Sequence, residues 1–124
     1  MAVNYGQAEI DRFQKQAAAG TLHFDPAAVD EVVRYFDAVI SELRGAQRDA
    51  ATLFVAGFGG FPSGSELQQG LTWKLAETTT TLKVFIEGAI RIQEGFLRAG
   101  GRISDADQKL AALQQIVQPG GGQR

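Results

Sequence analysis

Apolar residues recur in alternating steps of three and four along two long stretches of the chain. In the first stretch, about residues 26 to 56, the apolar positions are Val29, Val32, Phe36, Val39, Leu43, Ala46, Ala50 and Leu53. Charged residues occupy the opposite face. Because three to four residues complete one helical turn, this spacing places the apolar residues on one side of a helix. The pattern predicts an amphipathic helix about 45 Å long, at about 1.5 Å per residue.

A second stretch, from about residue 65 to Ala99, repeats this spacing more regularly. One line of apolar residues, called the interaction seam below, follows it for more than three heptads: Leu71, Leu75, Leu82, Phe85, Ile92 and Phe96. The threonines at 78–81 favour a strand by composition, but the seam passes through them without a change of phase. We therefore expect one long helix. A seam of this length indicates a helical partner.

A glycine-rich aromatic segment, Gly57 to Gly64, separates the two stretches. Its turn motif consists of Phe58, Gly59, Gly60 and Phe61. Glycine allows backbone angles that other residues oppose. Residues 63–66 then have capping-box spacing, which is typical of a helix start. The chain is therefore predicted to reverse here, so that the two long helices form an antiparallel hairpin.

A shorter helix is predicted before the hairpin. Residues 7–19 place Ile10, Phe13 and Ala17 on one face, and Gly20 suits a left-handed C-terminal cap. This helix and a matching one after the hairpin would flank the two long helices.

Polar residues and prolines mark the remaining helix ends. Asp25 followed by Pro26 signals the start of the first long helix, because the carboxylate accepts an N–H and proline has none to leave unpaired. Residues 104–107 have capping-box spacing and open a last helix, which ends before Pro119. Residues 1–118 are thus predicted to be one all-α domain, an antiparallel hairpin with flanking helices packed in a dimeric bundle. Residues 119–124 are predicted to be a flexible Gly-rich tail.

Composition narrows the classes of function. The chain has 124 residues and a net charge of -2, and its Lys/Arg and Asp/Glu residues are evenly mixed, so we expect no nucleic-acid partner. It contains no cysteine, which excludes disulfides and thiolate metal sites. The N-terminus shows neither the basic nor the apolar region of a signal peptide, and no apolar run has the roughly 20 residues of a transmembrane helix.

The sequence gives little support for a catalytic or cofactor site. His23 is the only histidine, and one histidine without cysteine cannot form a usual zinc site. The glutamates on the long helices are not arranged as Glu-x-x-His pairs, which di-iron bundles need. The glycine-rich turn is not followed by the lysine of a phosphate-binding loop. The prediction is a protein that is not an enzyme and binds no cofactor.

The helices and the turn together resemble the WXG-type helical-hairpin proteins of actinobacterial type VII (ESX) secretion. Similar proteins join two antiparallel helices through a Trp-x-Gly turn, and Phe58, Gly59 and Gly60 stand at that place in this chain, with Phe instead of Trp. The resemblance covers about residues 24–117 and includes the sequence from Leu22 to Pro26. It implies a homodimer or heterodimer with another helical hairpin, a type VII secretion ATPase as a further partner, and export without a cleaved signal peptide.

The family also carries a Tyr-x-x-x-Asp/Glu signal after its second helix. At the corresponding place Phe96 is followed by Gly100, which has no acidic side chain. A looser version is met by Ile103, Asp107 and Leu110, which we take as the candidate secretion signal. The alternative is a cytoplasmic helical scaffold or chaperone-like protein unrelated to secretion.

Overall fold

The computed structural model describes residues 5–56 and 64–117, and α-helix is the only regular secondary structure in this part of the chain. It contains four helices: α1 (Gln7–Ala18), α2 (Pro26–Ala56), α3 (Gly64–Ala99) and α4 (Ile103–Val117). The predicted order of two long helices between two short ones is confirmed, and the threonine-rich run of α3 is helical. The turn motif Phe58, Gly59, Gly60 and Phe61 lies outside the described residues, as does the 119–124 tail.

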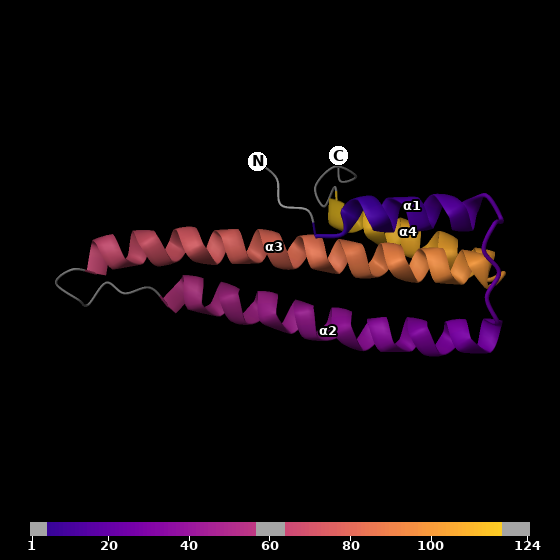
Figure 1. The fold of residues 1–124 in the computed structure, drawn as a ribbon. Helices are drawn as coiled ribbons and strands as arrows, with labels where there is room; N and C mark the ends of the chain where they lie inside the picture. Colours follow the sequence, from indigo (N-terminus) through magenta and orange to yellow (C-terminus); the bar gives the residue numbers. More distant parts are fainter. Residues whose placement is uncertain (1–4, 57–63, 118–124) are drawn as a thin grey trace, which may run out of the picture.

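Helix α3 is the centre of the arrangement, since it packs against each of the other three helices. Helices α2 and α3 lie side by side and run in opposite directions (Figure 1). Both short helices accompany only the C-terminal half of α3. The described residues therefore form a four-helix half and a second half, called the arm below, in which α2 and α3 have only each other as helical neighbours among them.

The ends of the helices follow the local signals in the sequence. After α1, Gly20 has a φ of 80°, and the N–H of Thr21 donates to the carbonyl of Gln16 at 3.1 Å. After α3, Gly101 has a φ of 82°, in the same left-handed region. The Oδ2 of Asp25 accepts a hydrogen bond from the N–H of Ala28 at 3.1 Å, so the predicted N-cap of α2 is confirmed.

The predicted cap of α4 is wrong. The helix begins at Ile103, and the N–H of Ala106 donates to the carbonyl of Arg102 at 3.0 Å. Ser104 therefore lies inside the first turn rather than before it. Asp107 forms an ion pair with Arg98 of α3 at 3.0 Å. The tight turn at Gly101 starts α4 earlier than the capping-box spacing indicates.

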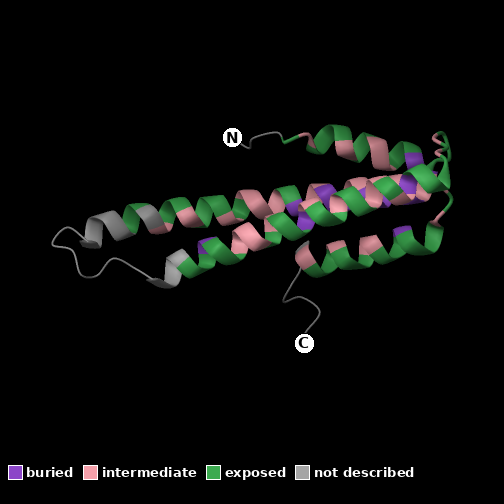
Figure 2. Cartoon of the chain, turned by 90° about the horizontal axis from the view of Figure 1, so that it is seen from below, coloured by how far each residue is buried: buried purple, intermediate pink, exposed green. Residues whose placement is uncertain are grey.

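The core lies mainly in the four-helix half (Figure 2). One cluster contains the buried residues Ile40, Ile86, Ala89 and Ile90. A second cluster contains the buried residues Val29, Leu97 and Ala106. On α3 the buried residues Ile86, Gln93 and Leu97 each come one residue after a position of the interaction seam. The reason is that α2 and α4 together cover this face, whereas the interaction seam lies on the side between α1 and α2.

Candidate interaction surfaces

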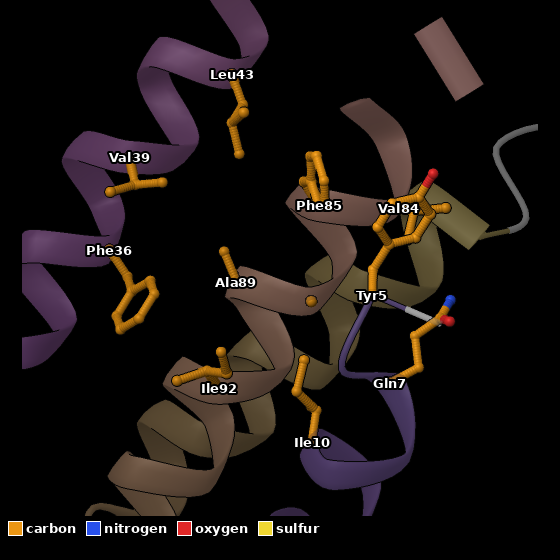
Figure 3. A pocket seen from close by; sticks show the side chains of 11 residues that line it. Tyr5, Gln7, Ile10, Phe36, Val39, Leu43, Val84, Phe85, Ala89 and Ile92 are labelled. Carbon is orange, nitrogen blue, oxygen red and sulfur yellow. The ribbon is translucent and has the colours of Figure 1, made fainter. Parts of the chain in front are cut away.

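An apolar groove lies between α1 and α2, with α3 as its floor (Figure 3). Its volume is about 310 Å³. The wall on the α1 side consists of Tyr5, Gln7 and Ile10. The wall on α2 consists of Phe36, Val39 and Leu43. The floor on α3 consists of Val84, Phe85, Gly88, Ala89 and Ile92.

The groove exists because α1 sits close to α3 but apart from α2. Gly88 and Gly95, seven residues apart on α3, face α1: a Cβ at Gly88 would lie 3.4 Å from Ile10, and one at Gly95 would overlap the ring of Phe13. The two glycines let α1 approach α3, yet α1 makes no helix contact with α2. The space between them is left to the groove.

The interaction seam follows the open side of α3. Phe85 and Ile92 lie in the floor of the groove, and Phe85 is 40% exposed, with its ring edge against Tyr5 at a centroid distance of 5.0 Å. Leu75 and Leu82 lie on the arm and are half-buried. The side chain of Leu71 lies outside the described residues. The role of the seam in binding a partner stays a prediction.

The other end of the seam is covered within the chain. Phe96 packs against Phe13 of α1 and against Phe24, each at a centroid distance of 5.1 Å. The covering residues come from the N-terminal segment, which sequence reasoning treated only as a flank. Phe13 was identified there as part of an apolar face, but nothing in the sequence indicated which helix that face would meet.

The arm presents an exposed tryptophan. Trp73 is 77% exposed, and it borders a shallow hollow with Ala76, Glu77 and Thr80. Lys74 forms an ion pair with Glu77 beside it at 3.2 Å. Trp73 lies two residues before Leu75 and is not part of the interaction seam. An exposed tryptophan on a helix is typical of a contact surface.

A polar network lies on the side of α3 that faces away from the groove. It was not predicted from the sequence. The buried carboxylate of Glu94 accepts hydrogen bonds from Gln14 of α1 at 2.8 Å and from Arg98 at 2.6 Å. Arg98 also donates to Asp107 of α4, and its hydrogen bonds with Glu94 and then Asp107 raise the pKa of Arg98. The network joins α1, α3 and α4 by hydrogen bonds, so its role is to hold these three helices together. Its only sequence signal is the Glu94 to Arg98 spacing of four residues.

The candidate secretion signal lies on one face of α4. Ile103 is 47% exposed, Asp107 is exposed and Leu110 is half-buried. Their spacing of four and three residues aligns them along the helix. The bond from Arg98 holds the Asp107 carboxylate beside the end of α3. Recognition of this face by a secretion machine stays a prediction.

Other kinds of site find little support in the described residues. His23 is exposed, and among residues 5–56 and 64–117 no three His, Cys, Asp or Glu side chains gather as a metal site would need. Within the same ranges no helix is both long and apolar enough to cross a membrane. Comparisons with protein-family models, with curated proteins and with solved structures find no significant match.

Proposed function

We propose that the protein acts by binding other helical proteins, as a type VII secretion substrate or as the pairing partner of one. The observation that carries this proposal is the arm, where the long hairpin continues without the covering that α1 and α4 provide in the other half. Trp73 is exposed on the arm, which also carries the half-buried seam residues Leu75 and Leu82.

A second helical hairpin would complete the arm. In the four-helix half, α3 has three helical neighbours, and this number lets it bury a full stripe of side chains. On the arm it has one. Two helices from a partner, either another copy of this chain or a similar hairpin, would supply the missing neighbours and give a dimeric bundle. A type VII secretion ATPase would then act on the pair.

The pairing test uses the only tryptophan of the chain as a reporter. Emission from Trp73 should shift to shorter wavelength when a partner covers it, both on self-association at micromolar concentration and on titration with hairpin proteins encoded by neighbouring genes. Trp73→Ser should weaken that association by about tenfold or more, as expected for an aromatic anchor. Tyr35→Ser is the control, because Tyr35 is a similarly exposed aromatic residue on α2 (66%).

Two results would contradict the pairing proposal. One is a monomer whose tryptophan emission does not change with concentration or with any neighbouring hairpin protein. The other is association that Trp73→Ser and Tyr35→Ser weaken equally. Either result would remove the arm as a binding surface.

Export is tested separately through the signal face of α4. Asp107→Asn should lower the exported fraction in the host while leaving the fold intact. Asp105→Asn is the matched control, because Asp105 is also exposed and lies in the first turn of the same helix. Equal export of both variants and of the wild type would reject the signal role. If the wild type stays inside the cell, the cytoplasmic scaffold becomes the better proposal.

A further inference from the structure

The groove between α1 and α2 has the dimensions of a helix-binding site. Its floor extends along α3 from Val84 to Ile92, a rise of about 12 Å at about 1.5 Å per residue. This length corresponds to about two helical turns. A helix lying along it would place about three side chains in the groove, at positions i, i+3 or i+4, and i+7.

The interior of the groove suits apolar side chains. Of the side chains that line it, only Gln7 and the hydroxyl of Tyr5 are polar, and none is charged. Phe85 offers the face most open to an incoming side chain, since it is the most exposed large apolar residue of the floor. A charged or strongly polar ligand would lose its hydration here without gaining partners.

One exposed glutamate lies beside each wall of the groove. On α1, Glu9 comes directly before Ile10, which lines the groove, and one turn before Phe13, so it shares the face of Phe13. On α2, Glu42 lies three residues after Val39, at the outer edge of that wall. Both glutamates are exposed, and in the described part of the chain neither forms an ion pair.

Four other acidic residues are each paired with a cation on a neighbouring helix or turn. Ion pairs across helices join Asp30 to Arg102, Asp37 to Lys109, Asp107 to Arg98 and Asp11 to Arg91. All of them lie away from the groove. No Lys or Arg lines the groove among the described residues. Among the described residues, Glu9 and Glu42 therefore remain as acidic side chains without an ion pair beside the apolar channel between α1 and α2.

We propose that this groove binds an amphipathic helix of a partner protein whose apolar stripe is flanked by Lys or Arg. The apolar stripe fills the channel, and the long basic side chains extend over the walls to Glu9 and Glu42. A second copy of the chain is a poorer occupant. Its arm exposes the apolar Trp73, but the cation beside that residue, Lys74, is already paired with Glu77. This site lies in the four-helix half, so it is independent of pairing through the arm.

The test uses two synthetic helical peptides about four turns long. Both carry leucine at i, i+4 and i+7; one has lysines beside the leucines and the other has glutamates at the same places. Fluorescence anisotropy of the labelled peptides measures the dissociation constant with the full chain. The lysine peptide should bind at least about tenfold tighter than the glutamate peptide at low salt, and the difference should shrink as salt screens the charges.

Two variants and a control locate the peptide. Phe85→Gln should weaken the lysine peptide by about tenfold or more, because it removes the apolar floor. Glu42→Lys should weaken it by about two- to fivefold. Glu31→Lys makes the same charge change on the same side of α2 but eleven residues or about 16 Å nearer the start of the helix, before the first groove residue Phe36, and should leave the dissociation constant unchanged. Circular dichroism melts verify that each variant is folded. If Phe85→Gln is unstable, Glu42→Lys still tests the site, because Glu42 is exposed and its replacement should not disturb the core.

Three outcomes would overturn this proposal. They are failure of both peptides to bind, equal binding of the two peptides, and equal effects of Glu42→Lys and Glu31→Lys. Self-association that Phe85→Gln abolishes would assign the groove to a second copy and would also overturn it. Trp73→Ser should not affect peptide binding. The experiments therefore distinguish failure of the groove proposal from failure of the pairing proposal.

Discussion

Replacing Gly95 by alanine tests the contact that holds α1 against α3. An added Cβ would lie 2.8 Å from Cδ2 of Phe13 and 3.1 Å from its Cζ, with another ring atom closer still. The ring cannot retreat freely, because it packs against Phe24 and Phe96 at centroid distances of 6.5 and 5.1 Å. Overpacking of this kind costs about 1–3 kcal/mol.

The same substitution also has a favourable component. Alanine is better than glycine inside a helix by about 0.8–1.0 kcal/mol. Gly70→Ala isolates this gain, because nothing lies within 4 Å of a Cβ at Gly70, on the same helix. We expect Gly70→Ala to stabilise the protein by about 0.5–1 kcal/mol and Gly95→Ala to fall about 1–3 kcal/mol below it.

Urea unfolding measures this difference, and amide hydrogen exchange shows where it acts. In Gly95→Ala the amides of α1 should lose protection first, since α1 packs against no helix other than α3. A Gly95→Ala protein as stable as Gly70→Ala, with α1 equally protected, would refute the close packing of α1 at this glycine.

Three further predictions concern local structure. Asp25→Ala should lower the free energy of unfolding by about 0.5–2 kcal/mol, because the N–H of Ala28 loses its acceptor; a urea titration showing no loss would contradict the cap. Gly101→Ala should cost about 1–2 kcal/mol in the same assay, because Gly101 has a φ of 82°; an unchanged midpoint would argue against this backbone angle. Asp107→Asn should cost at most about 1 kcal/mol, because the Asp107 side chain is 65% exposed in its pair with Arg98, and a much larger loss would show a buried role.

The sequence by itself determined the helices and most of their ends. The three-and-four spacing, the glycines after α1 and α3 and the Asp25 cap all act within a few residues of the chain, so they can be read without knowing the fold. It also located the apolar residues that became the open side of α3, including Phe85 and Ile92. The expected cap at Ser104 failed because the neighbouring turn at Gly101 started α4 earlier.

Only the tertiary structure decided which face of α3 became the core. The apolar stripe of α3 is wide enough to serve either the line through Phe85 and Ile92 or the line through Ile86 and Leu97. The line through Ile86 and Leu97 is buried because α2 and α4 pack against it. The line through Phe85 and Ile92 forms the floor of the groove instead. Helical periodicity specifies the angle of each side chain around its own axis. It does not specify where the other helices pack, and burial depends on both.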